Sequence, residues 1–324
     1  MNDRYFAMAL DPIHIGTGGY RLGRVDNTIV REPGTNLPKI PGTTIEGNAR
    51  TYAYYKERET AEPNGCKKPE EGCALGKKDP CGRCRVCITF GYTDAKQTTF
   101  RVKDTDKKGK EIKVPASLHG MAQFSDARIL FFPVYSLIGP VWVTTPSVLN
   151  DVGSDNLPVE AENKIRTKLI KKGEKLNLGW LYLENEDEFS IPAGSLGNVP
   201  QEIKTRAVLV SEKLFSYVVN SNLEVRTSVA IDPRTGAAEE GALFTYEAIQ
   251  RATVLWFDVT YQDPKWFNCG IEKNNKLEKP DLVNDIERVV KQGLTLFGIL
   301  GIGGMQTRGF GRMKILNLGS DTAK

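Results

Sequence analysis

The stretch that decides the fold is glycine-rich and reads Gly298-Ile-Leu-Gly301-Ile-Gly303-Gly304-Met-Gln306-Thr307-Arg308-Gly309-Phe310-Gly311-Arg312. Glycine loses more conformational entropy on folding than any other residue, so this density indicates positive φ angles or a close approach to other atoms. Side-chain donors are interleaved with the glycines, and residues 299–313 contain no acid. Backbone N–H groups, a hydroxyl and guanidinium groups favour a phosphate cradle. A tight turn between a helix and the last strand is the alternative.

Two familiar glycine motifs do not fit this loop. Gln306 stands where a dinucleotide fingerprint that begins at Gly301 requires a glycine, and no Gly-Lys-Ser/Thr follows for a nucleotide P-loop. We therefore interpret the loop as a grip on a phosphate chain rather than on a mononucleotide.

Composition indicates a full hydrophobic core and a mild positive charge. Of 324 residues 40% are apolar, and 44 Lys and Arg residues against 40 Asp and Glu residues give a net charge of +4. This balance excludes a protein coated in cations but allows a basic groove on one face. The first ten residues lack the apolar segment of a signal peptide, and no run of about 18 apolar residues follows, so we expect a cytoplasmic protein without a membrane partner.

The cysteines predict a structural metal site. Five of the six fall between Cys66 and Cys87, and Cys81, Cys84 and Cys87 form overlapping C-x-x-C steps, which bring thiolates to one tetrahedral ion. Cys73 is the natural fourth ligand and Cys66 the alternative. An all-thiolate set leaves no open position for catalysis, so structural Zn²⁺ is expected, with an iron–sulfur cluster as the lesser possibility.

Apolar periodicity and turn residues predict an α+β fold. Strands are expected at residues 5–10, 121–134, 223–231, 240–246, 253–261 and 310–318, and helices at 43–55 and 280–297. Thr43 or Thr44 is the expected N-cap of the first helix. This order favours helices on one face of an antiparallel sheet, of the ferredoxin-like (RRM-like) kind.

The chain divides into a core interrupted by two insertions. The expected parts are 1–59 (first part of the core), 60–120 (cysteine-rich insertion and charged loop), 121–150 (core), 151–200 (an inserted hairpin or lobe) and 201–324 (the remainder of the core with the glycine-rich loop). Within the second insertion, Lys164 to Lys175 is a basic stretch that would line a groove or form an ordinary charged surface.

Four sequence blocks carry a resemblance to a known family. They are Asp11-Pro-Ile-His14 through Gly23-Arg-Val-Asp26-Asn, Pro41-Gly-Thr-Thr44-Ile-Glu-Gly-Asn-Ala-Arg50, Asp126-Ala-Arg-Ile-Leu-Phe-Phe-Pro-Val-Tyr-Ser136 and the glycine-rich loop. Together they span most of the chain in the right order. The chain resembles the RAMP proteins, the RNA-binding ferredoxin-like family of CRISPR effector complexes, and more narrowly the target-RNA-cleaving backbone subunit of the type III-B (Cmr) complex.

The resemblance implies a fold, an assembly and an activity. It implies a RAMP core with a zinc-binding insertion and a β-hairpin thumb, which maps most plausibly to residues 151–200. Copies of the subunit would line up with other effector subunits along a CRISPR RNA (crRNA). Each thumb would displace one nucleotide, and target RNA would be cut beside it at regular intervals. Asp26 occupies the place of the family's cleavage residue.

Position and resemblance together select the candidate RNA contacts. They are Arg21, Arg24, Thr43, Thr44, Arg50, Gly303, Gly304, Gln306, Thr307, Arg308 and Arg312. Many relatives have lysine where Glu46 stands, so Arg50 and the helix start at Thr43 and Thr44 are expected to supply more of the local grip.

RNA carries its own nucleophile, the 2′-OH, and a protein that holds it in line with the phosphorus accelerates cleavage by positioning. Asp26 would deprotonate the 2′-OH or hold a divalent metal, Mg²⁺ or Mn²⁺, against the phosphate. The expected products are a 2′,3′-cyclic phosphate and a 5′-OH. His14, Tyr246 and Glu247 are lesser catalytic candidates, and His14 alternatively makes a structural hydrogen bond. Read without the family, Asp26-Asn27 is a turn pair.

Two rival functions remain at this point. One is a structural crRNA-binding subunit without cleavage. The other is a stand-alone metal-dependent ribonuclease, which the scarcity of acids disfavours because only Asp11 and Glu32 lie close to Asp26 in sequence.

Overall fold

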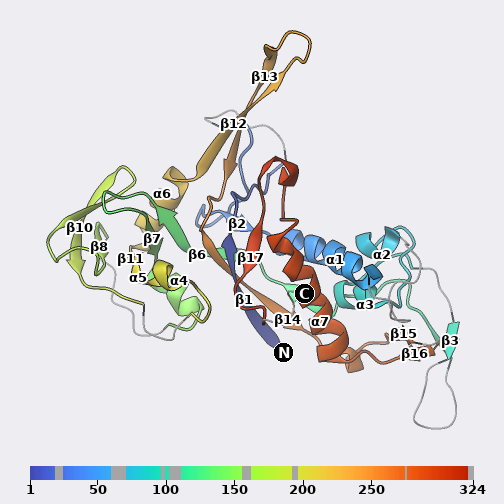
Figure 1. Cartoon of the computed structure of the whole chain (residues 1–324). Helices are drawn as coiled ribbons and strands as arrows, with labels where there is room; N and C mark the ends of the chain where they lie inside the picture. The colour runs from blue at the N-terminus through green and yellow to red at the C-terminus, as the bar shows by residue number, and fades with distance from the viewer. Residues whose placement is uncertain are drawn as a thin grey trace.

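The structure is a computed structural model that describes residues 1–18, 25–59, 71–95, 99–101, 111–154, 162–191, 196–273 and 276–319. In these ranges the strands form one large sheet and several two-stranded ribbons, with helices packed against the sheet (Figure 1). The predicted mixture of helices and strands is therefore confirmed. None of the helices so described is long and apolar enough to cross a membrane.

One end of the large sheet is a four-stranded antiparallel unit. Its elements in chain order are β1 (Asn2–Ala9), α1 (Gly42–Glu59), β6 (Ala127–Val134), β14 (Val254–Tyr261), α7 (Arg288–Thr295) and β17 (Met313–Ile315). In space the strands follow the order β17-β1-β14-β6, and each neighbouring pair is antiparallel. The two helices lie side by side (Figure 1).

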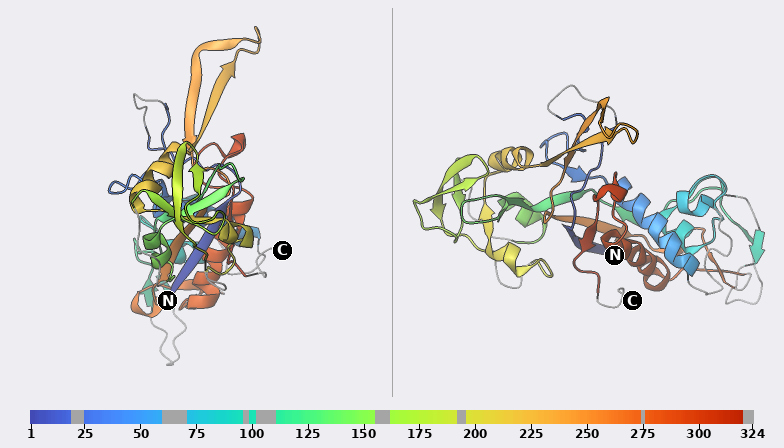
Figure 2. Two further views of the ribbon diagram at one scale, coloured as in Figure 1. Left: turned by 90° about the vertical axis from the view of Figure 1, so that its left-hand side faces the viewer. Right: turned by 45° about the horizontal axis from the view of Figure 1, so that its top comes forward.

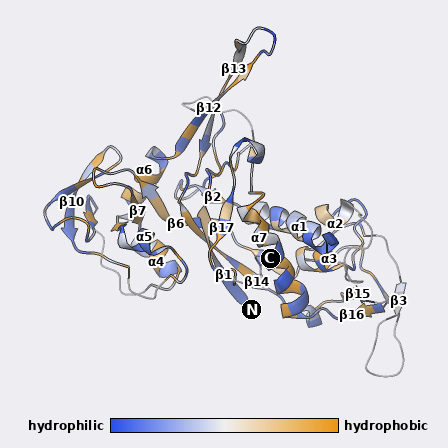
Figure 3. Ribbon diagram, viewed as in Figure 1, coloured by the Kyte–Doolittle hydropathy of each residue, from blue (hydrophilic) through white to orange (hydrophobic). Residues whose placement is uncertain are grey.

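Alternating side chains give this sheet two packed faces. Tyr5 and Ala7 of β1 join the cluster that α1 and α7 cover, while Phe6 and Met8 pack against a second cluster on the other face. Successive side chains of a strand point to opposite faces, which explains the division. The strands β6 and β7 (Val141–Thr144) are almost wholly buried and hydrophobic (Figure 3). The core thus extends from the four-stranded unit into the sheet beyond it.

Beyond β6 the sheet continues into a lobe. The strands follow in the order β7, β11 (Ala207–Leu209), β8 (Lys164–Arg166), β10 (Leu181–Asp187) and β9 (Lys175–Leu178), while β2 (Lys39–Ile40) pairs with β6 and β5 (Ala122–Phe124) with β14. The helices of this part are α4 (Pro146–Asp151), α5 (Gln201–Thr205) and α6 (Glu212–Ser221). Residues 162–191 therefore extend the large sheet.

A long hairpin projects from the rest of the molecule (Figures 1 and 2). It consists of β12 (Glu224–Ile231) and β13 (Ala238–Ala248), which pair from Glu224 opposite Ala248 to Ile231 opposite Ala238. A two-stranded ribbon is marginally stable in water by itself. The foot of this hairpin must therefore be held by other parts of the chain.

The cysteine-bearing insertion packs onto the core beside α1. Its elements are α2 (Glu71–Leu75), α3 (Arg85–Phe90), β3 (Thr99–Arg101) and β4 (Glu111–Lys113), and late in the chain β15 (Ile271–Lys273) and β16 (Lys276–Glu278) form a ribbon near it (Figure 1). Arg85 Nε donates to Asp285 Oδ1 over 2.8 Å, and its Nη1 lies 3.5 Å from Glu57 Oε2 of α1. All three side chains are buried, so this charge network ties α3 to α1 and to the turn before α7.

Three elements differ most from the sequence prediction. The strand expected at 121–134 is divided into β5 and β6. The helix expected at 280–297 begins with a π-helical turn, Leu282–Glu287, and ends after α7 in a 3-10 turn, Leu296–Gly298. The last strand starts only at Met313, because the residues before it still belong to the glycine-rich loop. Two further 3-10 turns are Pro264–Trp266 and Gln306–Arg308.

Candidate functional site

Asp26 is bound to the foot of the β12–β13 hairpin. Its Oδ2 accepts hydrogen bonds from the Thr245 amide (2.8 Å) and hydroxyl (2.7 Å), and its own amide donates to Thr245 Oγ1 (2.9 Å). Asn27 continues the attachment, because its amide donates to the Thr245 carbonyl and its carbonyl accepts from the Glu247 amide, both over 3.0 Å. The segment around Asp26 thus runs along β13, and Asp26 is fixed at the base of the hairpin.

These hydrogen bonds keep the Asp26 carboxylate ionised. The Thr245 hydroxyl, and after it the Thr245 amide, lower the pKa of Asp26 below its ordinary value because both donate to the charged form. The other oxygen, Oδ1, has no hydrogen-bond partner among the residues that the structure describes. Asp26 therefore combines a fixed position, a negative charge and a free acceptor atom. The sequence analysis did not select Thr245 as a site residue, although Thr245 directly precedes the candidate Tyr246.

The three lesser catalytic candidates are near Asp26 but have structural partners. His14 is buried, its Nδ1 lies 2.6 Å from the Glu247 carbonyl oxygen, and its ring meets the Tyr246 ring edge-on at 5.8 Å. The Glu247 carboxylate accepts from Arg31 Nη2 (2.6 Å) and from the Ile29 amide (3.2 Å). These contacts support the structural alternative for His14, and they give Glu247 the role of anchoring the first loop.

The glycines of the C-terminal loop allow close packing against the segment after β1. The Gly304 amide donates to the His14 carbonyl (2.9 Å) and the Gly311 amide to the Pro12 carbonyl (2.8 Å). Gly303 has φ +82°, and a side chain there would collide with His14 and Ile15. The expected cradle of free amides is therefore partly used by the protein itself. The glycine-rich loop contacts His14, His14 contacts Glu247 of β13, and Asp26 is bound to Thr245 of the same strand. The loop and Asp26 therefore lie in one region of the fold although they are far apart in the sequence.

The polar side chains of the same loop remain accessible. Gln306, Thr307 and Arg308 form the exposed 3-10 turn. Arg312 makes a two-pronged ion pair with Asp11, at 2.6 Å from Nε and 3.0 Å from Nη2. This contact with Arg312 holds the pKa of Asp11 below its usual range. The candidate grip on RNA thus consists of side chains on a rigid turn, rather than of a row of glycine amides.

The start of α1 differs from the prediction. The helix begins at Gly42, whose amide donates to Asp126 Oδ1 over 2.8 Å, so Asp126 supplies the cap that was expected from Thr43 or Thr44. Thr43 is exposed and Thr44 half-buried. Both remain available as surface contacts.

Arg50 points into the protein rather than toward solvent. Its side chain is buried, with Nε donating to the Cys73 carbonyl (2.9 Å) and Nη1 to the Phe90 carbonyl (3.3 Å). A side chain at Gly76 would collide with the guanidinium, so the turn after Cys73 packs directly on it. The expectation that Arg50 binds RNA is corrected by this burial. It braces the cysteine-bearing segment instead.

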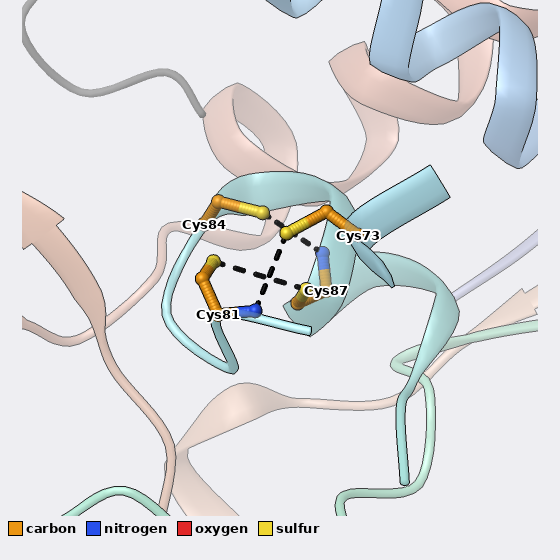
Figure 4. Close-up of side chains that lie close together, drawn as sticks. All are labelled: Cys73, Cys81, Cys84 and Cys87. Atoms are coloured by element: carbon orange, nitrogen blue, oxygen red, sulfur yellow. Dashed lines mark hydrogen bonds between the residues drawn. The ribbon is translucent and has the colours of Figure 1, made fainter. Parts of the chain in front are cut away.

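Four cysteines converge in the insertion (Figure 4). The sulfur atoms of Cys73, Cys81, Cys84 and Cys87 all lie within 4.8 Å of one another, and those of Cys81 and Cys87 are 3.9 Å apart. Tetrahedral zinc with Zn–S bonds of about 2.3 Å places its sulfur ligands about 3.8 Å apart. The Cys81 amide donates to the Cys73 sulfur (3.3 Å) and the Cys87 amide to the Cys84 sulfur (3.4 Å), as suits charged thiolates. The donor set therefore fits a metal such as zinc.

Replacing Arg50 by Met is expected to weaken both the fold and the metal site. The change leaves two buried carbonyls without their donor, which costs about 2–4 kcal/mol of unfolding free energy. We also expect a metal ion held by the four cysteines to be lost at lower chelator concentration, because Cys73 loses its support. Chemical denaturation and chelator competition measure the two effects. Arg58→Met, an exposed arginine of the same helix, is the control, and equal behaviour of the two variants would contradict the role given to Arg50.

Other predicted contacts have different outcomes. In the basic stretch from Lys164 to Lys175, Lys164 lies 3.2 Å from Glu184 and Arg166 3.0 Å from Glu186, while the other four lysines are exposed. It fits the ordinary charged surface better than a groove. Arg21, Arg24 and Cys66 lie outside the described residues.

The sequence profile of the RAMP superfamily matches residues 7–314. The chain belongs to the RAMP superfamily. The match includes the first loop, the cysteine-bearing insertion, the hairpin and the glycine-rich loop, so all parts of the candidate site fall within the RAMP region.

Proteins of CRISPR systems are similar to this chain in sequence and in fold. The CRISPR system Cmr endoribonuclease Cmr4 of Pyrococcus furiosus is 26% identical over 268 residues, which cover 76% of this chain and 77% of that protein. Oligomeric Cmr4 from Pyrococcus furiosus matches in structure with a TM-score of 0.54 and 20% identity, covering 97% of this chain and 98% of the other. A chain of the type III-B Cmr-beta complex bound to cognate target RNA matches with a TM-score of 0.57 and 14% identity, covering 98% and 96%.

Proposed function

We propose that this RAMP protein is a crRNA-binding backbone subunit of a type III CRISPR effector complex that cleaves bound target RNA. Its similarity to a Cmr endoribonuclease supports the activity. Similar folds in an oligomeric Cmr4 and in a Cmr-beta complex with target RNA support the assembly. In such a complex the subunit would contact crRNA, target RNA, copies of itself and other effector subunits.

The observation that carries the proposal is the attachment of Asp26 to the foot of a projecting hairpin. The sequence suggested residues 151–200 as the thumb that displaces a nucleotide. We favour the β12–β13 hairpin for this role, because residues 162–191 extend the sheet whereas the hairpin stands clear of it with Asp26 at its base. A nucleotide pushed aside by the hairpin would present its 2′-OH to Asp26.

The electrostatics of Asp26 bear on how it would act. A carboxylate whose pKa is lowered is a weak base near neutral pH, so proton removal by Asp26 alone is the less favourable route. Its fixed charge and free Oδ1 suit a divalent ion, Mg²⁺ or Mn²⁺, together with RNA phosphate oxygens. Such an ion, when bound, supplies positive charge to the phosphate. The role of the protein is to hold Asp26 beside the RNA backbone at the displaced nucleotide.

The insertion and the core have supporting roles in this proposal. Cys73, Cys81, Cys84 and Cys87 would hold a structural Zn²⁺ that fixes α3 and the turn braced by Arg50. The order strand–helix–strand–strand–helix–strand, with the strands arranged β17-β1-β14-β6, supports a ferredoxin-like core. Gln306, Thr307, Arg308 and Thr43 are exposed residues proposed to contact the crRNA backbone.

The first test is the RNA that the protein carries and cuts. We expect the chain, expressed with a CRISPR array and its partner subunits, to co-purify with short RNAs that share one repeat-derived 5′ tag. We also expect the isolated chain to leave unguided RNA intact, because a single fixed acid does not form a two-metal nuclease site. Sequencing of the bound RNA and a cleavage assay check the two points. Efficient cutting of unguided RNA by the isolated chain would instead support the stand-alone nuclease.

A further inference from the structure

A basic pocket lies at the foot of the hairpin, and of its three arginines only Arg312 is among the candidate RNA contacts named above. It has a volume of about 590 Å³ and is lined by Arg226, Arg251 and Arg312, with Glu224 and residues 10–12. The chain brings these groups together from the end of β1, the start of β12, the turn before β14 and the residues before β17. A pocket of this volume is in the size range that admits a nucleotide-sized group.

The charges in the pocket leave a surplus of cations. Arg312 pairs with Asp11, and Arg226 Nε donates to Glu224 Oε1 over 2.5 Å. Arg251 is exposed and has neither a hydrogen bond nor an ion pair within the described part of the chain. Three guanidinium groups against two carboxylates give a local charge of +1. An anion that enters the pocket would therefore find guanidinium N–H donors that are not already bonded to the carboxylates of Asp11 and Glu224.

The pocket is built on fixed elements. The amides of Leu10 and Asp11 both donate to the Arg312 carbonyl, at 2.8 and 3.2 Å, which joins two of its walls. The Arg226 guanidinium lies 4.6 Å from the centre of the buried Phe310 ring. Arg251 lies in the tight turn before β14, and the Ala252 amide ties this turn to the end of β1 by donating to the Ala9 carbonyl (2.8 Å). The Arg226 and Arg312 guanidinium groups, which are held by these partners and by Glu224 and Asp11, lose little freedom when a ligand binds.

The pocket and Asp26 lie on different sides of the hairpin. Arg226 is paired with Tyr246, and Thr227 with Thr245, so the side chains of Arg226 and Thr245 leave the ribbon on opposite faces. Thr245 holds Asp26. A polyanion that passes around the foot of the hairpin would therefore meet the acid on one side and the arginines on the other.

We propose that the pocket of Arg226, Arg251 and Arg312 binds a phosphate group of an RNA backbone as it passes the foot of the hairpin. Planar guanidinium groups match phosphate through paired N–H donors, and Arg251 is the free member of the set. Arg226 and Arg251 were not among the residues selected from the sequence. The identity of the polyanion as RNA rests on the proposed function.

The test is the RNA affinity of assembled complexes that contain Arg251→Ala. We expect a roughly tenfold loss of affinity for crRNA or for target RNA, and a decrease of about 0.7–0.9 in the slope of log affinity against log salt. Arg58→Ala removes one exposed arginine from the far end of α1 and serves as the matched control, with no change expected. Arg251→Lys keeps the positive charge but loses the paired N–H donors of the guanidinium group. Its RNA affinity should therefore lie between those of the wild type and Arg251→Ala. Measuring crRNA retention and target-RNA binding separately identifies which of the two RNAs the pocket contacts.

The outcomes separate this inference from the proposed function. If wild-type complex binds and cuts RNA while Arg251→Ala equals Arg58→Ala in affinity and salt slope for both strands, the pocket inference is wrong and the proposed function stands. A loss of affinity with an unchanged salt slope would also contradict a phosphate contact. If wild-type complex does not bind RNA, the proposed function itself is wrong.

Discussion

Replacing Asp26 by Asn in the assembled complex is expected to slow target-RNA cleavage about 10²- to 10⁴-fold while target affinity changes by less than about twofold. The amide keeps the shape of the side chain but removes the charge that the Thr245 hydrogen bonds stabilise. Single-turnover cleavage of labelled target, with binding measured in parallel, separates the two effects. Asp232→Asn, near the other end of the same hairpin, is the matched control and should cut at the wild-type rate.

The pH dependence gives this prediction a second readout. Because the pKa of Asp26 is lowered, its ionised form persists below the ordinary aspartate pKa and is lost only as the pH falls through the lowered value. Thr245→Val removes the hydroxyl donor, so the pKa should rise and the acid limb of the pH–rate profile should move to higher pH. An unchanged limb in Thr245→Val would show that the titrating group is not Asp26.

Loss of the metal site should have the largest effect on stability. We expect Cys87→Ser to abolish stoichiometric zinc and to lower the free energy of unfolding by more than about 4 kcal/mol. Cys87 is fully buried, and Cys73 and Cys84 belong to the same hydrophobic core cluster. The insertion is therefore packed against the core of the protein. Metal analysis of the purified protein and chemical denaturation measure the two effects.

A matched cysteine controls this experiment. Cys269 lies outside the cluster of four, so Cys269→Ser should retain zinc. A brown protein with visible absorption would identify an iron–sulfur cluster in place of zinc. Full stability of the wild-type chain after complete metal removal would contradict a structural role for the site.

Local patterns predicted the parts of the molecule that depend on sequence neighbours. Overlapping C-x-x-C steps place Cys81, Cys84 and Cys87 within one turn of backbone, and Cys73 joins them from α2 in the structure. The strands expected at 223–231 and 240–246 agree with β12 and β13 to within two residues at each end. In both cases the information lies within about 25 residues of sequence.

Tertiary partners explain the predictions that were incomplete. The sequence shows that Arg50 is a cation but not that the carbonyls of Cys73 and Phe90 surround it, since these partners come from a distant segment. The glycines were recognised as unusual, yet their purpose is the contact of two backbones separated by nearly the whole chain. Thr245 was missed for the same reason, because it becomes informative only when Asp26 is seen beside it.

The most direct test of the central claim is a map of target cleavage in complexes assembled from mixtures of wild-type chain and Asp26→Asn. If each copy cuts beside its own Asp26, cleavage at every one of the regularly spaced positions should fall in proportion to the fraction of variant chain, and the products should end in 2′,3′-cyclic phosphates. Undiminished cutting at those positions in complexes made wholly of Asp26→Asn would contradict the account.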